Sequence, residues 1–71
     1  MSADNAVFIK KWNNRFYVWY GSMSNWQENK LHKPPNKAYF NYEFIESARK
    51  KAIEFANIYQ YLEYGIIEEI D

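Results

Sequence analysis

The segment from Val7 to Tyr20 reads VFIKKWNNRFYVWY and decides the fold. It contains two runs, 7–12 and 15–20, that are rich in the β-branched and aromatic residues typical of strands. Asn13 and Asn14 separate the runs. Because asparagine tolerates the positive φ of a type I′ turn, this pair suits a two-residue hairpin loop. The segment therefore predicts an antiparallel hairpin over 7–20.

The hairpin has two faces of different chemistry, because side chains alternate between the faces of a strand. With Trp12 opposite Arg15, one face is mostly aliphatic, and we expect it to pack against a helix. That face carries Val7, Ile9, Lys11, Phe16, Val18 and Tyr20. The other face pairs aromatic with basic side chains, and we name it the aromatic–basic ladder. The ladder consists of Phe8, Lys10, Trp12, Arg15, Tyr17 and Trp19.

The segment 21–37 is polar and shows no hydrophobic period, which predicts a long loop. Trp26 and Leu31 are bulky apolar residues within it, and we expect both to anchor the loop to the body of the protein. Loops of this length in compact domains are often functional. The next segment, 38–41, is a candidate for a short third strand.

A helical period follows and extends over about 42–64. Its apolar residues form one stripe at three- and four-residue spacing, comprising Ile45, Ala48, Ala52, Phe55, Ala56, Tyr59 and Leu62. Asn41 is a suitable N-cap for this helix, and Gly65 suits the left-handed position after its end. The segment 66–70 combines isoleucine with glutamate and predicts a final strand.

Together these segments predict an α+β fold. We expect a small, mainly antiparallel sheet of three to four strands, with one long helix packed on one face. A right-handed crossover through the helix places the final strand parallel to the first. The chain of 71 residues corresponds to a single domain, 1–71. A chain this short has a thin core, and its high aromatic content is what compensates.

Charge is divided unevenly along the chain although the formal net charge is zero. Through Lys51 there are nine basic and four acidic residues, and from Ala52 onward there are five acidic residues and no base. The protein is therefore expected to have a positive region that attracts acidic partners.

The residues needed for common catalytic and metal chemistry are missing. There is no cysteine, and His32 is the single histidine, so no ordinary zinc or haem set can be assembled. Ser22, Ser24 and Ser47 have no histidine at a recognisable spacing, and two glycines cannot form a phosphate-binding loop. We therefore expect a protein that is not an enzyme and has no cofactor. A lone loop histidine such as His32 is expected to be a solvated side chain.

The aromatic–basic ladder has three interpretations. In the first, the ladder only stabilises the sheet, and the 21–37 loop folds over it as a second small core. In the second it is a protein interface, because Trp, Tyr and Arg dominate binding hot spots. In the third it binds nucleic acid, with bases stacked on the aromatic rings and phosphates paired with the cations. Neutral overall charge weighs against the third.

The interpretation we adopt from the sequence is a small protein-binding module. Its site is the ladder, and the loop adds four candidate contacts, Trp26, Lys30, Lys33 and Lys37. The partner is expected to present an acidic surface. A composition rich in Asn, Lys, Ile and Tyr further suggests a modulator or inhibitor of a host protein, encoded by a phage or mobile element. A nucleic-acid-binding regulator and a self-associating structural subunit, such as a homodimer, are the alternatives.

The N-terminal residues lack the basic and apolar regions of a signal peptide, and no apolar run is long enough to span a membrane. We therefore expect a cytoplasmic protein, in a bacterium or a host cell, without membrane contact.

Overall fold

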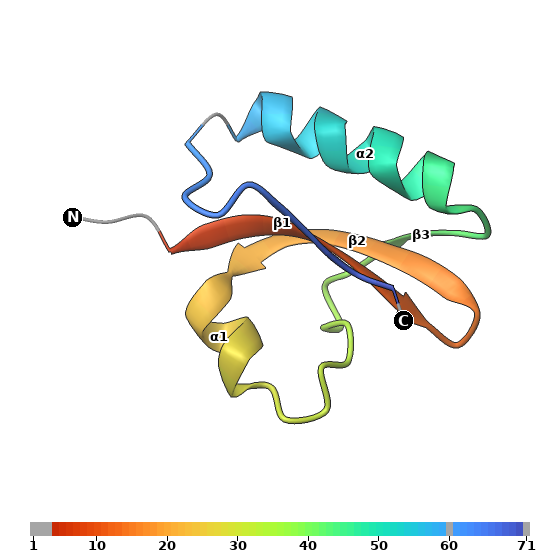
Figure 1. Ribbon diagram of the computed structural model, residues 1–71, viewed down its shortest axis with the longest axis horizontal. Coiled ribbons are helices and arrows are strands. Elements are labelled where there is room, and N and C mark those ends of the chain that lie inside the picture. Colours follow the sequence, from red (N-terminus) through yellow and green to blue (C-terminus); the bar gives the residue numbers. More distant parts are fainter. Residues whose placement is uncertain (1–3, 60, 71) are drawn as a thin grey trace.

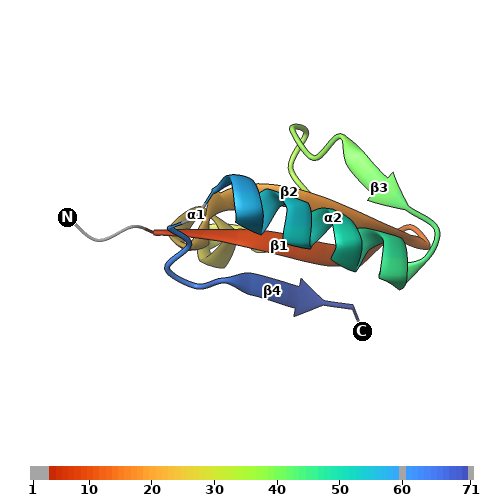
Figure 2. The ribbon, with the colours of Figure 1, turned by 90° about the horizontal axis from the view of Figure 1, so that it is seen from above.

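The computed structural model describes residues 4–59 and 61–70. Its elements are β1 (Asn5–Trp12), β2 (Arg15–Ser22), α1 (Met23–Glu28), β3 (Phe40–Tyr42), α2 (Ile45–Ile58) and β4 (Ile66–Glu69). The strands form one sheet in the order β3-β2-β1-β4, and α2 lies over its central pair (Figure 2). β1 is antiparallel to β2 and parallel to β4, and β2 is antiparallel to β3. The α+β fold is confirmed, with a mixed sheet.

The hairpin has the predicted turn and register. Asn13 and Asn14 have φ values of 51° and 63°, as a type I′ turn requires. Trp12 lies opposite Arg15, and the pairing continues without a bulge to Asn5 opposite Ser22. Every residue between these pairs therefore lies on the face that the sequence predicted.

Both faces of the sheet are covered, each by a different element (Figure 1). On one face α2 closes a core in which Val7, Ile9 and Val18 meet the small residues Ala48 and Ala52. The two alanines are fully buried, so the helix axis lies close to the sheet. On the opposite face, α1 and the segment after it cover a second core. That core consists of Ala6, Phe8, Trp19, Trp26 and Ala38.

The helix α2 is shorter than the predicted 42–64. Tyr42 is paired with Phe16 in the sheet, so the helix begins only at Ile45, with Phe44 as its N-cap. Asn41 belongs to β3, and its prediction as the N-cap was wrong. The helix ends at Ile58, and the Tyr59 N–H donates to the carbonyl of Phe55. Residue 60, which the prediction also assigned to the helix, lies outside the described residues.

The early end of α2 follows from the path of the chain toward β4. Glu63 N–H donates to Asn5 Oδ1 at 2.9 Å, and Tyr64 N–H donates to the Asn5 carbonyl at 3.1 Å. These bonds tie the segment before β4 to the start of β1 and replace further helical bonds. Gly65 has a φ of 66°, the predicted left-handed conformation, but it precedes β4 instead of capping the helix.

The polar segment 21–37 contains the short helix α1, which its sequence did not predict. Ser22 is the N-cap, and its Oγ accepts a hydrogen bond from Asn25 N–H at 3.3 Å. Trp26 is buried and anchors the segment as expected, whereas Leu31 is 74% exposed, so its prediction as an anchor was wrong. The third strand is Phe40–Tyr42 instead of 38–41, because Ala38 is buried in the second core.

Within the described residues, neither helix has the length and apolar character needed to cross a membrane.

Candidate interaction surface

The structure places the aromatic–basic ladder largely beneath α1. Phe8 and Trp19 are 2% and 4% exposed, and Trp26 covers them. The Phe8 and Trp19 rings are stacked with their centroids 5.3 Å apart, and the Trp26 ring lies 5.5 Å and 5.2 Å from them. These three aromatic residues are thus core residues, although the sequence analysis placed them among the candidate contacts. Because the three rings pack on one another, they do not present an open row of ring faces on which nucleic-acid bases could stack.

The outer part of the ladder remains partly accessible. Trp12 and Tyr17 are half-buried and line a shallow hollow together with Lys33, Pro34 and Pro35. Arg15 is exposed, and its guanidinium donates to the side-chain and main-chain oxygens of Asn41 in β3. The ladder is therefore divided between a buried half and a half-exposed end near the turn. Lys30, Lys33 and Lys37 of the loop are exposed.

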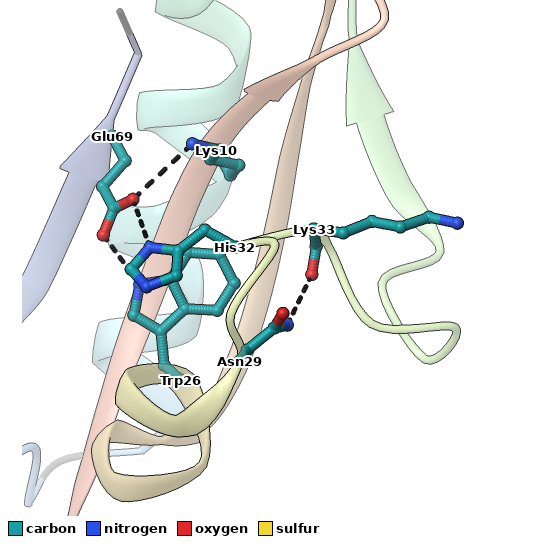
Figure 3. A network of polar contacts seen from close by, with 6 residues as sticks. All are labelled: Lys10, Trp26, Asn29, His32, Lys33 and Glu69. Atoms are coloured by element: carbon teal, nitrogen blue, oxygen red, sulfur yellow. Dashed lines mark hydrogen bonds and ion pairs between the residues drawn. The ribbon is translucent and has the colours of Figure 1, made fainter.

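Glu69 connects the loop to the sheet through three side chains (Figure 3). Trp26 Nε1 donates to Glu69 Oε2 at 2.7 Å, and His32 Nδ1 lies 3.0 Å from Oε1. Lys10 Nζ is 3.6 Å from Oε1. His32 also lies against the Trp26 ring, at 4.6 Å between centroids, while its side chain stays 40% exposed, so it is solvated as predicted but also held by these contacts.

The pKa of Glu69 is lowered overall. Partial burial raises the pKa, but hydrogen bonds from His32 and Trp26 and the nearby charges of His32 and Lys10 outweigh that effect. These contacts favour the ionised form of the carboxylate, which links β4 to the 21–37 loop through Trp26 and His32. Its partners are distant in sequence, and no motif signalled the cluster.

An aromatic surface that the sequence analysis did not single out lies between α2 and the edge of the sheet. Phe55 and Tyr59 from α2 and its C-cap meet Phe40 of β3 and Tyr20 of β2. The ring centroids are 5.6 Å apart for Phe40 and Phe55, and 4.0 Å apart for Tyr20 and Tyr59. We name this surface the aromatic groove. The hollow in it measures about 210 Å³ and is lined by Val18, Trp19, Tyr20, Lys37, Phe40, Phe55 and Tyr59.

The aromatic groove is basic at its rim. Lys51 Nζ lies 4.2 Å from the centroid of the Phe40 ring and 5.4 Å from that of Phe55, within the range of cation–π contact. Lys37 lines the hollow, and no carboxylate is among its lining residues. Lys51 also lies 3.5 Å from Glu54, a weak surface pair. The groove therefore offers aromatic area and positive charge to solvent.

Only part of this groove was predictable from the sequence. Phe55 and Tyr59 were assigned to the apolar stripe of the helix, which predicted burial. They remain partly accessible because β3 has only three residues and leaves the flank of α2 uncovered.

Across residues 4–59 and 61–70, no three His, Cys, Asp or Glu side chains come together as metal ligands would. No protein-family model matches the chain, and comparisons with curated proteins and with solved structures found no significant match. The surface chemistry described above is therefore what indicates a function.

Proposed function

We propose that this protein is a non-enzymatic protein-binding module whose partner contacts the aromatic groove. The observation that carries the proposal is an accessible cluster of aromatic side chains with lysines at its rim and no lining carboxylate. Phe40 is 42% exposed and Tyr59 38% exposed, and both rings lie beside Phe55, so the exposed aromatic area is contiguous. Exposed apolar clusters of this kind are typical of interaction sites.

The composition of the groove favours a protein partner. Aromatic side chains supply large contact areas with few rotatable bonds, and they are enriched at the centre of protein interfaces. Lys37 and Lys51 give the rim a positive charge, which favours an acidic partner surface and excludes basic ones. This agrees with the uneven distribution of charge along the chain.

This proposal keeps the function expected from the sequence but moves its site. Phe8, Trp19 and Trp26 are withdrawn as contacts because they are buried. The accessible part of the ladder is not part of the groove, because it lies next to the hairpin turn, at the other end from Tyr20. It comprises Trp12, Arg15 and Tyr17. The origin of the gene in a phage or mobile element rests on composition alone and stays a prediction, as does a role in modulating a host protein.

The test is affinity capture with three purified forms: the wild-type protein, a groove variant and a matched control. The groove variant is Phe40→Ala with Phe55→Ala. The control is Ile53→Ala, which removes an exposed apolar side chain from the same helix next to β4 residue Ile66. All three must give the same folded far-UV and near-UV circular dichroism.

We expect the wild type and the control to retain the same protein, in the presence of nuclease and at raised salt, and the groove variant to lose it. Equal capture by the groove variant would contradict the site. Recovery of nucleic acid, with loss of all bound protein on nuclease treatment, would contradict the function, because phosphate binding weakens steeply with salt.

A further inference from the structure

The edge of β2 is only half covered by β3. β2 extends from Arg15 to Ser22, but β3 pairs only with Phe16, Tyr17 and Val18. Before β3 the main chain forms turns instead of pairing with this edge: Tyr39 N–H donates to the Lys37 carbonyl, and Ala38 N–H donates to the Pro35 carbonyl. On the side away from β1, residues 19–22 therefore have no neighbouring strand among the described residues.

The main chain of Tyr20 faces this uncovered edge. In a hairpin with a two-residue loop, alternate residues bond to the partner strand, beginning with the pair next to the turn. Arg15, Tyr17 and Trp19 therefore bond toward β1, while Phe16 and Val18 bond toward β3. Tyr20 continues the second series, and no described residue hydrogen-bonds to its N–H or C=O. Free main-chain groups at an edge are the template for adding a strand.

Two hollows flank the same edge, one on each face of the sheet. The aromatic groove lies on the α2 side. On the α1 side, a hollow of about 130 Å³ is lined by Trp19, Gly21, Ser22, Asn25, Trp26, Asn29, Pro35 and Lys37. Side chains of an added strand alternate between the two faces of the sheet. Successive residues of such a strand would therefore enter the two hollows in turn.

The charges around the edge favour an added strand that carries acidic side chains. Lys37 lines both hollows, and none of their lining residues is acidic. No carboxylate of the described residues forms an ion pair with Lys37. An acidic side chain at this point would find a positive partner, and an aromatic or aliphatic side chain would fill the groove beside Phe55.

We propose that the β2 edge from Trp19 to Ser22 binds an extended acidic segment of a partner protein as an additional strand. The main chain of the segment bonds to Tyr20, an acidic side chain meets Lys37, and an apolar side chain enters the aromatic groove. Peptide recognition by strand addition combines main-chain affinity with side-chain pockets in this way. The inference rests on the proposed function and specifies what the groove binds.

The test uses a peptide selected on the wild-type protein from a displayed library of random decapeptides. We expect selected sequences to place an acidic residue next to an aromatic or aliphatic one. In the bound state, the Tyr20 amide should become protected from solvent exchange in NMR spectra. N-methylation of alternate peptide residues should abolish binding, and N-methylation of the residues between them should not, since only one series bonds to β2.

Two variants examine the charge. Lys37→Glu should lower the affinity for the peptide by roughly tenfold or more. Exchanging the acidic peptide residue for lysine should restore binding to that variant. Lys30→Glu is the matched control, because Lys30 is an exposed lysine that lines neither hollow. We expect it to bind the peptide nearly as the wild type does.

Several results would overturn the inference. If the peptide binds in the groove but tolerates N-methylation at every position, strand addition is wrong while the protein-binding function stands. If no peptide is selected and affinity capture also fails, both are wrong. If the Tyr20 amide is protected by increasing protein concentration alone, the edge pairs with a second copy. If oligothymidine, and no peptide, shifts the Tyr20 and Lys37 resonances, the edge is a nucleic-acid site.

Discussion

At the scale of single residues, Glu69 has the most consequential contacts in the loop region. It joins β4 to Trp26 and His32, which are 43 and 37 positions away. A strand over 66–70 was predicted, and strand alternation places Glu68 and Glu69 on its opposite faces. The partners of the two glutamates were not predictable, because ion pairs between distant segments depend on the final packing. Glu68 bonds to Arg49 of α2 with two hydrogen bonds of 3.0 and 2.9 Å.

The first residue-scale prediction concerns Glu69→Gln. Because the pKa of Glu69 is lowered in the folded state, its ionised form stabilises the protein above the unfolded-state pKa. This stabilisation is lost as the pH falls below about 5. The free energy of unfolding of the Gln variant should be about 1 kcal/mol lower than that of the wild type at neutral pH. It should also decrease less as the pH is lowered. Urea unfolding from neutral to acid pH measures both.

Glu63→Gln is the control, since Glu63 is exposed and its side chain has no bond to any described residue. Glu68, whose pKa is also lowered through its hydrogen bonds from Arg49, contributes equally to wild type and variants. Identical acid dependence of the wild type and Glu69→Gln would contradict the role assigned to this carboxylate.

At the scale of elements, the hairpin was predictable and α1 was not. The hairpin follows from local chemistry: two asparagines that accept positive φ and a strict alternation of side chains. The helix α1 has six residues, too few to show a period, and it depends on tertiary contacts. Its first turn is held by Ser22 and Asp4, and Asp4 Oδ2 accepts hydrogen bonds from Ser22 Oγ and Ser24 N–H.

The same reasoning explains the differences in α2 and at the candidate site. An amphipathic pattern continues to Leu62, but main-chain bonds to Asn5 end the helix earlier. The residues of the ladder were correctly predicted to share one face of the hairpin. Whether that face is covered could not be predicted, because α1 covers it and α1 was not predicted. The aromatic groove is accessible because β3 is short, and the length of β3 cannot be predicted from its local sequence.

The element-scale prediction is that α1 is a structural cover held by Trp26. Trp26→Ala removes the ring that closes the second core and should cost about 3–5 kcal/mol, enough to unfold much of so small a domain. Leu31→Ala, in the same segment but 74% exposed, should change the free energy of unfolding by no more than about 0.5 kcal/mol. Urea denaturation followed by tryptophan fluorescence measures both variants. Full stability of Trp26→Ala would mean that the ladder is not covered as described.

At the scale of the whole molecule, the sheet divides the protein into two sides with different tasks. The α1 side is closed by aromatic packing and by the Glu69 contacts, so it stabilises the fold. The α2 side combines an aliphatic core over β1 with an accessible aromatic groove over the edge of β2. The open edge, the groove and the lysines meet at one place, and this coincidence is what supports a binding role.

Hydrogen–deuterium exchange on the complex with the captured partner tests this central claim most directly. We expect slower exchange on binding in residues 19–22 of β2 and in the flank of α2 around Phe55. We expect no change at the hairpin turn. Protection confined to the Trp12–Tyr17 end of the hairpin and the Lys33 loop, with the groove unchanged, would contradict the account.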